Sequence, residues 1–157
     1  MPRHQYKRQP VLVDPLHASF EVAKLINYTM QDGKKDTAKK IIYEMMDDFK
    51  NQGEDPLKLI HKAISNVAPS VEVKPRRLGG ASYLVPTEVR KDRKLYLALT
   101  WILDAARAKS NKEFRSFKAK LSSEIIDASK SQGQAMTKKA QAEKLAEANK
   151  AFSHLKW

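Results

Sequence analysis

The amino-acid sequence predicts a mainly α-helical single domain of about six helices, with a protruding β-hairpin arm between the third and fourth helices. Apolar residues recur at helical spacing in successive segments. The spacing changes to strict alternation only around Gly79-Gly80. The length of 157 residues fits one hydrophobic core. We expect an extended basic N-terminal arm over residues 1–18 and a helical domain over residues 19–157, including the hairpin arm at 71–89.

The first two helices follow the arm. Ser19 precedes an apolar stripe from Phe20 to Met30, and Asp32-Gly33 is a turn signal that ends it. The second stripe consists of Ala38, Ile41, Ile42, Met45, Met46 and Phe49. It fits one face of a helix that stops near Gly53.

A third helix leads into the hairpin. Asp55-Pro56 supplies an N-cap and a first-turn proline, and the apolar pattern runs up to Pro69. Apolar and polar residues then alternate on both sides of Gly79-Gly80, which fits a two-residue turn that needs positive φ. Because an isolated two-stranded ribbon is marginal in water, we expect RNA or neighbouring proteins to support it.

Three more helical stripes follow Pro86. The fourth helix, expected to be the central one, contains Leu95, Ala98, Leu99, Ile102, Leu103 and Ala106 and ends near Lys109-Ser110. The fifth contains Phe114, Phe117, Leu121, Ile125 and Ala128 and is ended by Gly133. The sixth has fewer large apolar groups: Ala140, Leu145, Ala148 and Phe152.

Charge points to a polyanionic partner. The chain has 30 Lys and Arg against 18 Asp and Glu, a formal net charge of +12. Nucleic acid is the first partner to consider and an anionic membrane surface the second. No apolar run approaches the roughly 18–20 residues that span a bilayer, and no secretory signal is evident, so we expect no membrane partner. The absence of cysteine excludes disulfides and fits a reducing, cytosol-like compartment.

The hairpin carries the clearest candidate binding groups. Residues 71–91 contain five basic residues and two acidic ones, a local charge of +3. A strand of about eight residues, with a rise of about 3.3 Å per residue, could project some 25 Å from the helices. Arg76 and Arg77 are expected on opposite faces, where they could hold two phosphate-bearing strands apart. The alternative is a solvated hairpin packed on its own domain.

Other charges add to this picture. Basic clusters occur in the N-terminal arm, at Lys34-Lys35, at residues 90–94 and at Lys138-Lys139. Residues 44–55 hold five acids and only Lys50 as a base, a local charge of −4, so this end is expected to face away from RNA. The expected mechanism is electrostatic clamping of phosphates with shape selection, and with little sequence-specific base reading.

Catalytic patterns are missing from the sequence. The four histidines have no metal-ligand spacing or acid–base partner, and Gly79-Gly80 lacks the frame of a nucleotide-binding loop. Asp47 and Asp48 diverge on a helix, so they do not make a metal site. We expect no enzyme, metal or cofactor. The alternatives are a basic DNA-binding or architectural protein and, less favoured, a small nuclease.

Several stretches resemble one family. They are Asp32-Gly33-Lys34-Lys35, Ala63-Ile64-Ser65-Asn66-Val67-Ala68-Pro69 leading into Val71-Glu72-Val73-Lys74, Arg76-Arg77-Leu78-Gly79-Gly80, and Tyr83-Leu84-Val85-Pro86-Thr87-Glu88-Val89-Arg90. The ending from Ala146 to His154 adds to them. In this order and spacing, from about Asp14 to Trp157, the chain resembles the universal small-subunit ribosomal protein seven family.

The resemblance implies a structural constituent of the small ribosomal subunit. Members of the family bind the 3′ major (head) domain of small-subunit rRNA, nucleate head assembly, and lie near the exit-site tRNA and the mRNA path. The implied neighbours are small-subunit ribosomal proteins nine, eleven and nineteen, and no homo-oligomer is implied. The implied location is the cytoplasmic ribosome of a bacterium, with the plastid stroma as the alternative.

The resemblance also implies contact residues. The rRNA-binding candidates are Arg3, Lys7, Arg8, Lys34, Lys35, Lys74, Arg76, Arg77, Arg90 and Arg93. The hairpin residues expected near tRNA and mRNA are Leu78, Gly79, Gly80, Ala81, Ser82 and Tyr83. Leu84, residues 109–112 and 140–143, and Leu155 depart from the family pattern. The change at Leu84 puts one polar hairpin contact in doubt, and the altered late loops put their RNA contacts in doubt.

Overall fold

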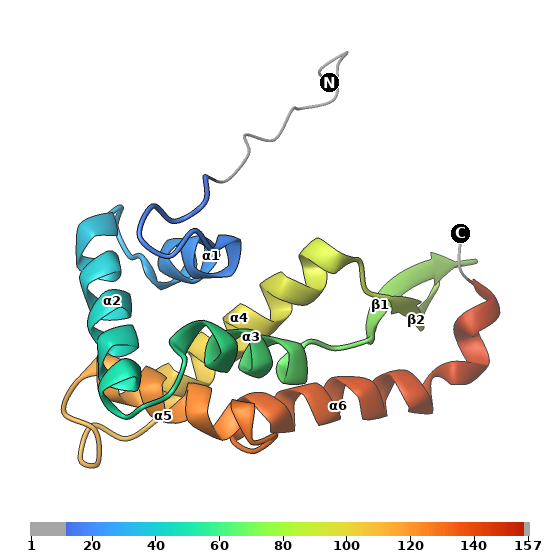
Figure 1. Ribbon diagram of the computed structural model, residues 1–157. Helices are drawn as coiled ribbons and strands as arrows, with labels where there is room; N and C mark the ends of the chain where they lie inside the picture. The colour runs from blue at the N-terminus through green and yellow to red at the C-terminus, as the bar shows by residue number, and fades with distance from the viewer. Residues whose placement is uncertain (1–11, 156–157) are drawn as a thin grey trace.

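The structure, a computed structural model, describes residues 12–155 and has a mainly helical fold interrupted by one hairpin (Figure 1). The elements are α1 (Phe20–Thr29), α2 (Lys35–Asn51), α3 (Pro56–Val67), β1 (Val71–Leu78), β2 (Ala81–Glu88), α4 (Lys91–Ala108), α5 (Phe117–Ser129), α6 (Gln134–Ala148) and the 3₁₀-helix η1 (Lys150–Leu155). The predicted fold class is confirmed: a single helical domain with an antiparallel hairpin between the third and fourth helices.

Local sequence signals set the starts of α1 and α3. The Ser19 side chain accepts a hydrogen bond from the backbone N–H of Val22 at 3.4 Å and caps α1. The Asp55 carboxylate accepts from the backbone N–H groups of Leu57 and Lys58, with Pro56 in the first turn of α3. Both predicted helix starts are confirmed.

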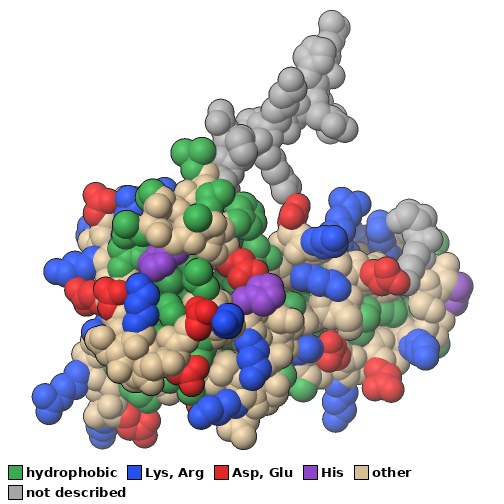
Figure 2. Space-filling model, in the orientation of Figure 1, with side chains coloured by type: hydrophobic (Ala, Val, Ile, Leu, Met, Phe, Trp, Pro, Cys, Tyr) green, Lys and Arg blue, Asp and Glu red, His purple; other side chains and the backbone are tan. Residues whose placement is uncertain are grey.

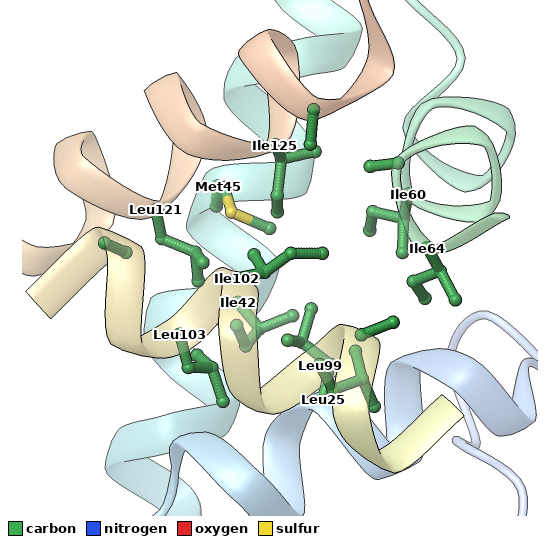
Figure 3. Packing of buried hydrophobic residues seen from close by; sticks show 14 of the residues in the cluster. Leu25, Ile42, Met45, Ile60, Ile64, Leu99, Ile102, Leu103, Leu121 and Ile125 are labelled. Carbon is green, nitrogen blue, oxygen red and sulfur yellow. The ribbon is translucent and has the colours of Figure 1, made fainter. Parts of the chain in front are cut away.

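The core is built around α4, as predicted. Leu99, Ile102 and Leu103 of α4 lie among side chains from α1, α2, α3 and α5 (Figure 3). These three residues are almost completely buried, and full burial of each such side chain stabilises the fold by about 1.5–3 kcal/mol. The helices that position the surface groups are therefore fixed by one continuous apolar core.

The end of the predicted N-terminal arm is attached to α2. Residues 15–17 form a turn rather than an extended segment. Buried Asp14 accepts hydrogen bonds from the Tyr43 hydroxyl at 2.6 Å and the His17 backbone N–H at 3.0 Å. Burial of Tyr43 and its bond to Asp14 raise the pKa of Tyr43 to about 12. Asp14, near the end of the predicted arm, is thus held beside α2.

The hairpin has the predicted two-residue turn. Gly79 and Gly80 both have positive φ, +55° and +87°, as a type I′ turn requires. The hairpin extends beyond the core helices, but α6 and η1 run beside it (Figure 1). The Tyr83 ring lies 5.3 Å from the Phe152 ring, centroid to centroid. The chain itself therefore supplies support that the sequence led us to expect from RNA and neighbouring proteins.

The last two predicted stripes need correction. Phe114 lies before α5, in the segment between α4 and α5. On α6 the buried residues are Ala135 and Ala146, whereas Ala140 and Ala148 are exposed and Leu145 is 47% exposed. Phe152 belongs to η1. The predicted face of α6 was wrong because this helix packs through alanines, which give a weak apolar period.

A buried carboxylate joins α4, α5 and α6. Glu124 is 0% exposed, and one of its oxygens accepts from the Ala135 backbone N–H at 3.0 Å. The other oxygen lies 3.1 Å from the Lys109 ammonium, which also contacts Asp127 at 3.0 Å. Since a buried charge is costly unless it is paired, this cluster fixes the end of α4 against the α5–α6 turn.

Gly133 in that turn generates a stability prediction. It has φ +95°, and a Cβ there would lie 2.9 Å from a Glu124 oxygen and 3.1 Å from the Asp127 Cβ. Gly133→Ala is expected to destabilise the protein by about 2–4 kcal/mol, combining backbone strain with displacement of a buried carboxylate. Denaturant unfolding measures this loss.

Gly53→Ala is the matched control, because Gly53 has φ +80° and open space around its Cβ position. It carries the backbone strain alone and is expected to cost about 1 kcal/mol. Equal losses for the two variants would contradict the role assigned to the Glu124 cluster.

Candidate nucleic-acid interface

Two predicted binding residues meet at one hairpin carboxylate. Glu72 on β1 lies 3.1 Å from the Lys74 ammonium and 3.1 Å from Nε of Arg93 in the first turn of α4. Burial of Glu72 raises its pKa, but the bonds from Lys74 and Arg93 outweigh that effect and hold the pKa of Glu72 below its ordinary value. The ion pairs tie the hairpin to the start of α4, so both cations belong to one surface.

An aromatic residue extends this surface. The Arg93 guanidinium lies 5.0 Å from the centre of the Tyr96 ring, and Tyr96 is 37% exposed. The ring of Tyr28 on α1 also contacts Tyr96, with the two ring centroids 5.6 Å apart. Sequence reasoning missed Tyr96. In the sequence, Tyr96 lies three residues after Arg93 and four after Asp92, at the basic start of a helix. This spacing could have indicated that Tyr96 and Arg93 are neighbours on the helix surface.

The two hairpin arginines lie on opposite faces, as predicted. Arg76 pairs with Tyr83 and Arg77 with Ser82 in the strand register, so the two side chains alternate. Arg77 is exposed, whereas Arg76 is half-buried on the face where Tyr83 meets the C-terminal 3₁₀-helix. The tip is accessible: Leu78, Gly79, Gly80, Ala81 and Ser82 are exposed, and Tyr83 is half-buried.

Lys34 and Lys35 stand at the start of α2. The preceding turn contains Asp32 and Gly33, both with positive φ, at +52° and +72°. Both lysines are exposed, and no side chain caps this helix start. The positive end of the helix dipole and two ammonium groups therefore coincide.

The remaining candidates divide into two groups. Arg90 is exposed at the N-cap of α4, close in sequence to Arg93. Arg3, Lys7 and Arg8 lie outside the described residues. The described candidates thus fall into a hairpin–α4 surface, formed by Lys74, Arg76, Arg90 and Arg93 with Arg77 on the other face of the hairpin, and a separate pair at the start of α2.

Some basic residues are used inside the protein. Lys138 pairs with Asp104 at 3.3 Å, and Lys139 donates to the Asn66 backbone carbonyl at 2.7 Å. Lys120 is buried and donates to the carbonyl of Lys109 and the side chain of Asn111. The basic cluster predicted at Lys138-Lys139 is therefore engaged in holding α6 to its neighbours.

The acidic segment lies at the opposite end from the hairpin. Residues 44–51 belong to α2, which stands at the far side of the helices from β1 and β2 (Figure 1). Several of its acids are paired; Asp48, for example, lies 2.8 Å from the Lys118 ammonium. Lys and Arg side chains gather over the hairpin side of the visible face, while acids are more frequent at the α2 side (Figure 2).

Two kinds of site are absent from residues 12–155. No group of three or more His, Asp or Glu side chains there is arranged to hold a metal ion. Within the same residues, no helix combines the length and apolarity needed to cross a membrane.

Fold and surface together define a class: basic, mainly helical proteins with a cationic hairpin, the type of surface that suits a polyanion. A family model described as ribosomal protein S7p/S5e matches residues 1–150. The chain belongs to this family, which consists of structural ribosomal proteins rather than enzymes.

Bacterial relatives agree with this assignment. A small ribosomal subunit protein uS7 from Stenotrophomonas maltophilia (strain K279a) is 47% identical, over 96% of this chain and 95% of the relative. The protein of the same name from Xanthomonas euvesicatoria pv. vesicatoria (strain 85-10) is 45% identical over the same shares. One from Xanthomonas campestris pv. campestris (strain B100) is also 45% identical, again over 96% and 95%.

The residues expected to depart from the family pattern have definite places in the fold. Leu84 is 41% exposed on β2, and Leu155 ends η1. Lys109 and Asn111 are bound within the α4–α5 segment by Glu124 and Lys120. Glu143 accepts from both the backbone N–H and the hydroxyl of Ser70, at the base of the hairpin. Lys109, Asn111 and Glu143 therefore take part in contacts within the protein.

The lowered pKa of Glu72 predicts a pH-dependent stability. A carboxyl whose folded pKa is depressed stabilises the protein above its unfolded pKa, and this contribution is lost as the pH falls through the folded pKa. Glu72→Gln is therefore expected to lower the unfolding free energy by about 1 kcal/mol at pH 7. The difference from the parent protein should shrink toward zero below the ordinary Glu pKa of 4.5, as measured by denaturant unfolding.

Glu88→Gln removes a carboxylate that is exposed on β2, and it serves as the control. It should leave the acid limb of the stability profile unchanged. If the unfolding free energies of Glu72→Gln and the parent protein differed by the same amount at every pH, the ion-pair assignment would be contradicted.

Proposed function

We propose that this protein is a structural constituent of the small ribosomal subunit and binds the 3′ major (head) domain of small-subunit rRNA. The observation that carries the proposal is the hairpin–α4 surface, in which Glu72 holds Lys74 and Arg93, with the exposed Arg77 on the opposite face of the same strand. Membership of the ribosomal family supports the choice of rRNA over duplex DNA. The function is shape and charge recognition, without catalysis.

Binding is proposed to occur at several separated points. Lys34 and Lys35 offer a second cationic site at the start of α2, where backbone N–H groups add to their attraction for phosphate. Arg3, Lys7 and Arg8 supply a third group from the N-terminal arm. A rigid helical core fixes the first two sites relative to each other, so only an RNA folded to match can reach both.

Ion pairing does not remove Lys74 and Arg93 from this role. An ammonium has three donors and a guanidinium has five, so each can bind Glu72 and still donate to a phosphate oxygen. The carboxylate lowers the net positive charge of this surface, but it orders both side chains before RNA binds. Preordered cations lose less conformational entropy on binding RNA.

The hairpin tip is proposed to lie near the exit-site tRNA and the mRNA path. Residues 78–82 are exposed, and the two glycines make the tip narrow. Early binding through the helical sites would let the protein nucleate assembly of the subunit head. Small-subunit ribosomal proteins nine, eleven and nineteen are the proposed neighbours, with the protein present as a single copy.

The proposed location is the ribosome of a bacterial cytosol. The relatives that support this come from bacteria of the genera Stenotrophomonas and Xanthomonas. A plastid ribosome is the alternative, and recovery of the protein with small subunits from its own source would decide between them.

The double variant Arg76→Ala with Arg77→Ala tests the role of the hairpin. Affinity for a transcript of the rRNA 3′ major domain is expected to fall about tenfold to a hundredfold, because two charge-assisted contacts to phosphate are lost. The slope of log affinity against log salt should decrease by about 1–2. Filter binding at several salt concentrations measures both, and circular dichroism checks the fold.

Lys40→Ala with Lys58→Ala is the charge-matched control, since these exposed lysines pair with Glu44 and Asp55 near the acidic segment. It should change the affinity much less. A parent affinity that does not depend on salt would overturn the electrostatic account. An unfolded hairpin double variant would show that Arg76 and Arg77 are structural.

A further inference from the structure

A row of aromatic and cationic side chains runs along α1 and joins the start of α4, which lies between α1 and the hairpin (Figure 1). On α1, Phe20, Lys24 and Tyr28 follow one another at intervals of four residues, so they line one side of the helix. The Tyr28 ring then contacts the Tyr96 ring of α4 at an interplanar angle of 78°. Arg93, three residues before Tyr96, completes the row. We call these five residues the aromatic row.

Each cation of the aromatic row lies against a ring. The Lys24 ammonium is 5.4 Å from the centre of the Phe20 ring, and the Arg93 guanidinium is 5.0 Å from the centre of the Tyr96 ring. Both distances fall within the roughly 6 Å over which a ring attracts a cation. Arg93 is also bound to Glu72, which connects the row to the hairpin. These contacts order the side chains before any ligand arrives.

Both cation–ring pairs are open to solvent. Phe20 is 44% exposed and Tyr96 is 37% exposed, whereas Tyr28 is half-buried. The Arg93 side chain is 48% exposed, and its guanidinium adds a flat group beside the Tyr96 ring. A single exposed ring needs no explanation, but exposed rings that alternate with cations form a patch of the kind that binds a ligand.

Unpaired RNA has the chemistry that fits the aromatic row. The faces of its bases stack on aromatic rings and on guanidinium groups, and its phosphates attract Lys and Arg. Paired RNA fits less well, because neighbouring base pairs cover the base faces. From Phe20 to Tyr28 the row extends about 12 Å along α1, the length of roughly three to four stacked nucleotides.

An apolar peptide is a poorer match than RNA. It would cover the Phe20 and Tyr96 rings, but it would supply no anion to Lys24. Within residues 12–155, Lys24 contacts the Phe20 ring and pairs with no carboxylate. An RNA strand supplies an anion at every nucleotide, so it can satisfy the rings and the cations together.

We propose that the aromatic row is a stacking platform for a short unpaired stretch of the rRNA. One base stacks on the Phe20 ring and another on the Arg93–Tyr96 pair, while Lys24 binds a phosphate between them. Tyr28 is a positioning residue that holds the Tyr96 ring beside α1. The inference rests on the proposed rRNA binding, and it adds that the RNA beside α1 and the start of α4 is single-stranded.

Tyr96→Leu and Tyr96→Phe test the platform as a pair. Leu keeps an apolar side chain without a ring, whereas Phe keeps the ring without the hydroxyl. In filter binding to a transcript of the rRNA 3′ major domain, Tyr96→Leu is expected to bind about fivefold to fiftyfold more weakly, because base stacking is lost. Tyr96→Phe should stay within about twofold of the parent protein. Neither variant changes a charge, so the slope of log affinity against log salt should not change.

Phe20→Leu is the second test, and it should weaken binding by a similar factor. Phe114→Leu is the matched control, because Phe114 is half-buried and has the Lys109 ammonium 5.5 Å from its ring centre, outside the aromatic row. This control removes the same kind of cation–ring contact from the segment between α4 and α5. It should bind the transcript as the parent protein does. Melting temperatures check the fold of every variant.

Ultraviolet cross-linking of the parent complex gives a readout that needs no variant. Mass spectrometry of the cross-linked peptides should find nucleotides attached at Phe20 and Tyr96, and these nucleotides should be unpaired in the transcript. If Tyr96→Leu did not fold, Phe20→Leu and these cross-links would still decide the question.

The outcomes separate this inference from the proposed function. If the parent protein does not bind the transcript, the proposed rRNA binding fails. If the parent binds but Tyr96→Leu and Phe20→Leu bind equally tightly, rRNA binding stands and the platform is overturned. The platform is also overturned if Tyr96→Phe loses as much affinity as Tyr96→Leu. Loss of a neighbouring protein from subunits assembled with these variants, at unchanged RNA affinity, would mark the row as a protein contact instead.

Discussion

A two-stranded ribbon buries too little surface to hold its own shape, and this constraint organises the molecule. The C-terminal part of the chain supplies the missing support: α6 and η1 lie beside the hairpin, and Phe152 contacts Tyr83. Glu143 bonds Ser70 at the hairpin base, and Glu72 bonds Arg93 on α4. The position of the hairpin arginines therefore depends on contacts between segments far apart in sequence.

The high net charge of +12 is divided between two uses. Inside the domain, Lys109 and Lys120 satisfy buried or half-buried oxygens around Glu124, where an unpaired charge would be costly. At the surface, the hairpin, the start of α4 and the start of α2 carry cations on rigid elements. Net charge alone thus overstates the binding surface, while placement on fixed elements gives the remaining cations a defined geometry.

The features that local sequence encodes were predictable. The capping of α1 and α3 and the glycine turn of the hairpin each depend on a few consecutive residues. The roles of Glu72, Lys139 and Tyr96 were not, because each depends on a tertiary neighbour: Lys139, for example, reaches a carbonyl 73 residues away. The face of α6 was predicted wrongly because alanine packing hardly differs from an exposed alanine in sequence.

The central claim, that the C-terminal residues hold the hairpin in place, is tested most directly by amide hydrogen exchange on Phe152→Ala. The account predicts exchange at least about tenfold faster in residues 71–88, with the core helices α2 and α4 unchanged. His154→Ala, an exposed change in the same 3₁₀-helix, should leave hairpin exchange as it is. Unaltered exchange in the Phe152→Ala hairpin would contradict the claim.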